Sequence, residues 1–185
     1  MRCLERLLRR ARLPLGMSEG FHPKPRMTFP SALAVGIAGR EEVMEFEMAE
    51  PCSADDVLRR MLPHMPPGLA ITRAEVLPEK CRKAQVRSVS YEVPLPPPRR
   101  AAAAERIDRL LAASTCPVER PSRRTPLDLR PQLELLALED GVLRMRLRVE
   151  REGSAGPRDV LAALDLGPLE QEGVCLTRTA VELLP

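Results

Sequence analysis

Proline residues divide this chain into short segments whose apolar residues recur with regular spacing. The twenty prolines cluster at segment ends, as at Pro63, Pro66 and Pro67 and again over residues 94–98. Proline fixes φ and lacks an amide hydrogen, so it interrupts helices and central strands. The chain must therefore fold from short helices and strands that meet at proline-containing turns. Because the runs between the prolines are periodic, they argue against a disordered chain.

The second half of the chain predicts an alternating order of strands and helices. Apolar residues alternate with polar ones over 89–95, which is typical of a half-buried strand, and they recur at helical spacing over 104–111. Two strands are expected on either side of the EDG turn at 139–141. A short helix that begins near Pro157 and a closing strand in VCLTRTAVELL complete the order β-α-β-β-α-β. This is the order of a ferredoxin-like unit.

The first half predicts a similar order that begins with a helix over residues 2–12. Extended segments are expected over 27–35, 43–48 and 69–77, and Ser53 is expected to cap a helix that runs to about residue 62. The order α-β-β-α-β is that of the same unit without its opening strand. Since that strand lies in the middle of a ferredoxin-like sheet, we expect it to be encoded upstream of residue 1, from a start codon other than the assigned one.

We therefore predict an α+β fold made of two tandem ferredoxin-like units. The first covers residues 1–80, lacks its opening strand and contains the SEGFHPKPR motif. The second covers residues 84–185, and the two are joined near Glu79 to Arg87. Aromatic residues make up only 2% of the chain and Trp is absent, so both cores must be built mainly from Leu, Val, Ala and Met.

The apolar runs and the cysteines suggest a cytoplasmic protein with no membrane association. No apolar run reaches the roughly 20 residues that a membrane-spanning helix needs, and the arginine-rich start does not resemble a signal peptide. The five cysteines lie far apart, without the spacing of a zinc or iron–sulfur site, and are expected to be reduced thiols. The alternative is a metal site assembled from residues distant in sequence. We predict no cofactor and no metal ligand.

Positive charge gathers at the start of the chain. Residues 1–26 hold seven basic and two acidic side chains, although the whole chain has a net charge of only +3. Glycines and prolines of the SEGFHPKPR motif would hold its cations in an extended, low-entropy loop beside the arginine face of the first helix. Arginine forks match phosphate oxygens well. The predicted RNA- or anion-binding residues are Arg6, Arg9, Arg10, Ser18, His22, Lys24 and Arg26.

Two other interpretations of this motif stay open. In the first, the loop only connects a helix to a strand, Phe21 fills the core, His22 caps a carbonyl and the helix arginines form a solvated face. In the second, His22 takes part in catalysis, but it lacks an identified acid, nucleophile or metal partner. We predict no catalytic residue.

A second basic strip comprises Arg144, Arg146 and Arg148 on one predicted strand, for which the alternative role is cross-strand pairing. A three-residue loop of residues 139–141 would place Leu135 opposite Met145 and Glu134 opposite Arg146, which separates an apolar face from a charged face. In that register Glu134 partly neutralises Arg146, and Arg144 and Arg148 are the better candidates for a partner.

The stretch ERLLRRARLPLGMSEGFHPKPRMTFPSALAVGI, followed by EEVMEFEM, resembles the start of the radical-SAM-linked proteins. This family of unknown function is found fused behind a radical SAM enzyme or as a separate chain. The similarity is strong over residues 4–77 and weaker afterwards, and it ends in TRTAVEL. Relatives usually carry a strand and a short polar turn before the arginine helix. The resemblance implies association with radical SAM chemistry and RNA processing, and it supplies no catalytic residues.

Three functions follow as hypotheses. The leading one is a non-catalytic companion that binds RNA, or positions a macromolecular substrate, for a radical SAM enzyme encoded separately. The second is a protein–protein adaptor that uses the same arginine surface on an acidic partner. The third is a self-contained enzyme, such as a hydrolase, that uses His22 or acids drawn from Glu41, Glu42, Glu45 and Glu47.

Overall fold

The chain forms two units in a computed structural model that describes residues 2–79, 81–120, 125–150 and 153–185. The first unit comprises residues 1–30 and 44–83, and the second comprises residues 31–43 and 84–185. The sequence had assigned residues 31–43 to the first half. Lys80, within the predicted linker, lies outside the described residues. No helix in the described ranges has the length and apolar character needed to cross a membrane.

The described residues of the first unit form two α-helices, one short 3₁₀ helix and a pair of two-residue strands. Their bounds are α1 Arg2–Arg10, β1 Met27–Thr28, β3 Glu45–Phe46, α2 Ala54–Met61 and η1 Leu62–His64. As predicted, α1 buries Leu7 and Leu8, and the Ser53 hydroxyl caps α2 by accepting from the Asp56 amide. Both helices contribute to a core with Ala11 and Leu13, against which Phe46 and Met48 pack.

The predicted strands of the first unit are mostly wrong. Only two residues of 27–35 and two of 43–48 pair as strands, and within the described residues 69–77 no strand forms. Leu69, Val76 and Leu77 are all exposed there, so the apolar alternation of this segment is not matched by burial. Strand propensity reflects fit to a half-buried sheet surface, which this segment lacks. Two tandem ferredoxin-like units are therefore not confirmed.

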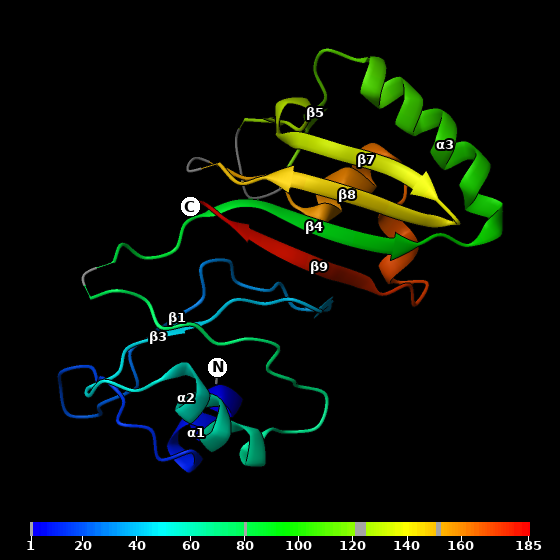
Figure 1. Cartoon of the computed structure of the whole chain (residues 1–185). Helices are drawn as coiled ribbons and strands as arrows, with labels where there is room; N and C mark the ends of the chain where they lie inside the picture. Colours follow the sequence, from blue (N-terminus) through cyan, green and yellow to red (C-terminus); the bar gives the residue numbers. More distant parts are fainter. Residues whose placement is uncertain (1, 80, 121–124, 151–152) are drawn as a thin grey trace. The chain divides into compact units, whose positions relative to one another are not determined.

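The second unit is a mixed sheet of five strands. Figure 1 shows this sheet with its helices. The elements of this unit are β2 Ile37–Gly39, β4 Val86–Pro94, α3 Pro97–Ala112, β5 Pro117–Val118, β6 Leu127–Asp128, η2 Arg130–Gln132, β7 Leu133–Glu139, β8 Val142–Arg148, α4 Pro157–Ala163, η3 Gly167–Glu170 and β9 Leu176–Leu183. The large sheet has the order β2-β9-β4-β8-β7, and β5 pairs separately with β6. Apart from β2, the short pair and the two 3₁₀ helices η2 and η3, the elements follow one another as predicted for the second half.

The core of the second unit lies between the sheet and its two α-helices. Ala103, Ile107 and Leu110 of α3 join Val160 and Leu161 of α4 in a single apolar cluster with the strands. Alternate strand residues enter this cluster, so both helices cover the same face of the sheet. As the composition predicts, the described residues of this core include one aromatic ring, that of Tyr91.

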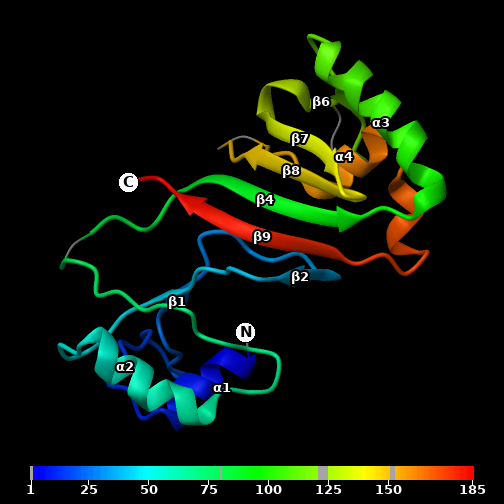
Figure 2. The ribbon, with the colours of Figure 1, turned by 45° about the vertical axis from the view of Figure 1, so that its right-hand side comes forward.

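Strand β2 adds an unpredicted edge to this sheet. It pairs in parallel with β9, with Ile37 opposite Leu176 and Gly39 opposite Arg178 (Figure 2). The two segments are thus far apart in sequence and adjacent in space. A three-residue strand gives no periodic signal, so β2 was not visible in the sequence. The closing strand β9 was predicted, but nothing in the sequence indicated that it pairs with so distant a segment.

The β7–β8 hairpin has a different register from the predicted one. Its turn has two residues, Asp140 and Gly141, both at positive φ (51° and 76°), as a type I′ turn requires. Glu139 therefore lies opposite Val142, and Leu135 lies directly opposite Arg146. The prediction of a three-residue loop was wrong.

A bulge in β7 explains why this register is tolerated. Leu133 pairs with Leu147 and Leu135 pairs with Arg146, so Glu134 is the extra residue. A shift of the register by one residue moves every side chain of a strand to the opposite face of the sheet. The extra residue of the bulge shifts the register by one more residue, so the side chains that precede it return to their original face. Leu133 consequently returns to the buried face. Leu135, which is 42% exposed, and Ala137, opposite Arg144, lie among the arginines.

Candidate functional site

The arginines of α1 lie on the face opposite its buried leucines. Arg2, Arg6, Arg9 and Arg10 are all exposed, whereas Leu7 and Leu8 are buried. The helix ends two residues before Arg12, which adopts a left-handed conformation with φ of 51°. Its carbonyl accepts a hydrogen bond of 3.2 Å from the Arg60 guanidinium of α2. The position of the arginine face is therefore fixed by packing and by this contact at the helix end.

The base of the SEGFHPKPR loop is held on one side by residues 45–49. The Gly16 amide donates to the Glu47 carbonyl (2.8 Å), and the Glu47 amide donates to the Arg26 carbonyl (3.0 Å). The Arg26 amide in turn donates to the Gly16 carbonyl (2.8 Å), which closes the loop. A Cβ at Gly16 would lie 3.0 Å from the Cβ of Glu47, so this close approach favours glycine.

A second set of contacts closes the loop nearer its tip. The Ser18 amide donates to the Lys24 carbonyl at 2.8 Å, and the Lys24 amide donates to the Ser18 hydroxyl at 3.0 Å. Met17 forms a bridge with Pro25, which is itself buried. The predicted role of Ser18 as a binding residue stays untested, but its hydroxyl already has this structural role.

The tip of the loop does not enter the core. Phe21 is fully exposed, and so is not the core plug that the connector interpretation expected. His22 is also exposed, with Gly20 at φ of 115° just before Phe21. The described contacts give His22 no carbonyl to cap and no acid or nucleophile to act with.

A shallow hollow joins the loop to α1. It is lined by Arg2, Glu5, Arg6, Arg9 and Lys24. Of the predicted binding residues, the structure thus brings Arg6, Arg9 and Lys24 together. Arg2 was missed, although its spacing of four residues from Arg6 places both on one helix face and could have indicated it. Across the described residues, no ion pair or side-chain hydrogen bond is found for Arg2, Arg6, Arg9, Arg10 or Lys24.

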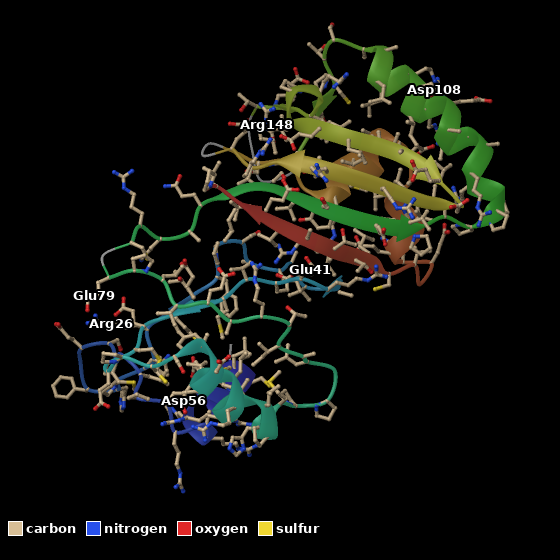
Figure 3. The ribbon with its side chains drawn as sticks, viewed as in Figure 1. Arg26, Glu41, Asp56, Glu79, Asp108 and Arg148 are labelled. Carbon is tan, nitrogen blue, oxygen red and sulfur yellow. The ribbon has the colours of Figure 1, made fainter. Side chains whose placement is uncertain are left out.

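Arg26 differs from these cations. Its guanidinium forms an ion pair with Glu47 at 3.1 Å, and both side chains are largely exposed. Figure 3 labels Arg26 and Asp56, which both lie in the first unit. The labelled Asp56 pairs with Arg59 and Arg60 of its own helix. Glu47 thus partly neutralises Arg26, whereas no acidic partner is found among the described residues for the arginines of α1 or for Lys24.

The second basic strip is paired along its whole length. Arg144 contacts Glu92 (3.2 Å) and Glu139 (2.7 Å), and Arg146 contacts Glu182 (3.7 Å). Arg148, at the end of β8 in Figure 3, contacts Glu134 at 3.2 Å. The expectation that Glu134 would partly neutralise Arg146, which made Arg144 and Arg148 the better candidates for a partner, was wrong, because it followed from the incorrect register.

Three of the four acids considered for catalysis, Glu42, Glu45 and Glu47, have structural contacts. Glu42 binds the buried Arg178 through Nε at 2.7 Å and also through Nη2. Glu45 accepts from the Thr28 hydroxyl at 3.3 Å, and Glu47 pairs with Arg26. Glu41 and Glu42 belong to the second unit, and Glu45 and Glu47 to the first. In the described ranges, no three His, Cys, Asp or Glu side chains gather closely enough to share a metal ion.

The described cysteines are free thiols. Cys52 donates a hydrogen bond from Sγ to Asp56 at 3.1 Å. This bond is the main reason why the pKa of the Cys52 thiol is raised, and it lowers the pKa of the Asp56 carboxyl. Burial is the main reason why the pKa of Cys116 is raised. Both thiols are thus held in the less nucleophilic protonated form.

Comparison with known proteins places the chain in one family. No curated protein matches the chain, and no solved structure matches it. A family model described as an uncharacterized protein conserved in bacteria (DUF2344) matches residues 1–158. This match covers most of the chain, including α1, the SEGFHPKPR loop and the hairpin of the second unit. The chain therefore belongs to the DUF2344 family of bacterial proteins.

Proposed function

We propose that this protein is a non-catalytic companion that binds RNA through α1 and the SEGFHPKPR loop, for a radical SAM enzyme carried on a separate chain. The observation that carries the RNA-binding part is the contrast between two sets of cations. Those of α1 and Lys24 have no acidic partner among the described residues, whereas each arginine of the β8 strip has one.

Unpaired cations on a preformed surface suit a polyanion. Such cations need not break existing ion pairs before they bind phosphates. When they neutralise phosphates, the counterions condensed on the nucleic acid are released, which favours binding. Arginine also presents a planar fork of donors that matches phosphate oxygens. The radical SAM partner is supported only by the resemblance of residues 4–77 to radical-SAM-linked proteins, and the positioning of a macromolecular substrate is part of the same proposal.

The test compares two triple variants that remove the same charge. In the first, Arg6, Arg9 and Lys24 are changed to Gln; in the second, Arg144, Arg146 and Arg148 are changed to Gln. RNA affinity is measured by filter binding over a range of salt concentrations. Loss of three phosphate contacts should flatten the slope of log affinity against log salt by about 2 in the first variant only.

Equal slopes for the wild type and the first variant would overturn the proposed surface. Circular dichroism of both variants establishes that the fold is retained. If the wild-type chain itself has no salt-dependent RNA affinity, RNA binding is refuted. The adaptor function then predicts that the first variant loses an acidic protein partner in a pulldown from native cells.

A further inference from the structure

The exposed aromatic ring at the tip of the loop is the feature that RNA binding through charge alone does not use. The chain has only three Phe and one Tyr. Tyr91 is buried and Phe46 packs against the core of the first unit, whereas Phe21 has a relative exposure of 102%. An exposed phenyl ring forgoes the stabilisation that burial would give it. In so aromatic-poor a chain, this placement calls for a role outside the core.

The loop holds Phe21 without needing to be ordered by a ligand. The paired contacts of Ser18 with Lys24, at 2.8 and 3.0 Å, close the loop on both sides of the tip. Pro23 restricts the backbone beside it, and buried Pro25 anchors its return. A ligand that binds a preformed loop loses less conformational entropy than one that must order it.

The charges around this ring define the ligand class. Lys24 follows Phe21 by three residues, which span at most about 11 Å, and the same lysine lines the hollow with Arg6 and Arg9. Glu19 lies in the loop and Glu5 lines the hollow, where cations outnumber acids by four to one (Arg2, Arg6, Arg9 and Lys24). A face-exposed aromatic ring beside a cationic track is the arrangement that binds single-stranded nucleic acids, since bases stack on the ring and phosphates bind the cations.

We propose that Phe21 stacks on an unpaired base of single-stranded RNA while Lys24, Arg6 and Arg9 contact the flanking phosphates. This inference rests on the proposed RNA binding and specifies its substrate class. Because every base has a π-face, the stacking contact should show little preference for sequence. The same contact should favour single strands over duplexes. In a duplex the bases are already stacked and paired, and Phe21 has no accessible face to cover.

The test uses the full chain and a fluorescein-labelled single-stranded RNA of mixed sequence, about 12 nucleotides long, matching the site size of small single-strand binders. Phe21→Ala should weaken binding by about 5- to 150-fold, the range measured for loss of one stacked base. The salt dependence of its affinity should equal that of the wild type, because no phosphate contact is removed. Binding to a duplex of the same sequence should not change.

A second variant reports the stack directly. The chain has no Trp, so Phe21→Trp introduces a single indole at the loop tip. This variant should keep the wild-type affinity, and its fluorescence should change when single-stranded RNA is added but not when the duplex is added. Because Phe21 is fully exposed, neither replacement should alter thermal unfolding.

The outcomes separate this inference from the proposal on which it rests. Equal affinities of wild type and Phe21→Ala for single-stranded RNA would overturn the stacking inference. If the Arg6, Arg9 and Lys24 variant still loses affinity, RNA binding itself survives that result. An equal loss on single-stranded and duplex RNA would also refute stacking, since it would show a contact that does not depend on an unpaired base.

Discussion

The ion pair between Glu42 and Arg178 should decide whether residues 31–43 stay on the sheet of the second unit. The Arg178 side chain is only 2% exposed, and its guanidinium donates to Glu42, to the Ser31 hydroxyl and carbonyl, and to the Ala32 carbonyl. All of these acceptors lie in residues 31–43. Glu42→Ala would leave a buried cation without its counter-charge.

The magnitude follows from burial. Breaking a buried ion pair by removing one partner costs about 3–5 kcal/mol. Arg178 would retain three hydrogen bonds, and the Glu42 side chain is 29% exposed, so water can reach the vacated position. We therefore expect a cost of about 2–3 kcal/mol, below or at the lower end of that range.

Hydrogen exchange at one amide measures this cost. The Arg40 amide donates to the Arg178 carbonyl at 2.9 Å, so it exchanges only when residues 31–43 leave β9. A loss of about 2–3 kcal/mol should speed its exchange by about 30- to 150-fold. Glu42→Gln, which keeps an oxygen acceptor without the charge, should have a smaller effect.

Glu41→Ala is the matched control, because Glu41 is the exposed neighbour of Glu42 and has the same side chain. Exposed substitutions usually change stability by no more than about 0.5 kcal/mol, or about twofold in exchange rate. Exchange of the Arg40 amide in Glu42→Ala within about twofold of the Glu41→Ala rate would refute the reasoning.

Two further predictions concern the hairpin and an ion pair of the second unit. Leu136 is buried and Leu135 lies on the charged face, so Leu136→Ala should lower the free energy of unfolding by about 2–5 kcal/mol and Leu135→Thr should change it by less than about 0.5 kcal/mol. Equal losses for the two variants in denaturant titrations would contradict the bulged register. The hydrogen bonds that Arg158 donates to Glu170 are the main reason why the pKa of Glu170 is lowered in the folded chain. As the pH falls, Glu170 is therefore protonated at a higher pH in the unfolded chain than in the folded one. Wild-type stability should therefore fall more steeply than that of Glu170→Gln as the pH drops below the ordinary glutamate value of 4.5, and parallel acid limbs would count against this.

Local patterns predicted most of the second unit. Residues 89–95 alternate cleanly because one face of β4 is buried, and the Pro157 start of α4 reflects a preference of the first helical turn. The bulge at Glu134 was not predictable from the alternation of β7, because the alternation favoured the wrong turn length. Type I′ chemistry at Asp140 and Gly141 was the stronger signal.

The site was predicted only in part, because pairing is a property of the folded chain. Helical spacing placed Arg6 and Arg9 on one face, and Arg144 and Arg148 were just as clear in the sequence. Only the structure shows that Arg144 and Arg148 form ion pairs, whereas none is found among the described residues for Arg6 and Arg9. The connector interpretation placed Phe21 in the core because phenyl rings are usually buried, and the sequence has no signal for its exposure.

The place of β2 in the sheet has a consequence for synthesis on the ribosome. Ile37 pairs with Leu176, and Glu42 binds a residue made 136 positions later. At 5–20 residues per second, this segment waits on the order of ten seconds for its partner strand.

Residues 1–30 of the first unit are translated before residues 31–43, and its second segment, residues 44–83, is translated during that interval. Residues 31–43 are then an open loop whose two ends belong to a unit already synthesised. Closing such a long-range parallel pair is a slow step in folding. Capture of residues 31–43 by the emerging β9 should therefore be among the last events in folding of the nascent chain, and codon choice before residue 176 can set how long the loop stays open to other partners.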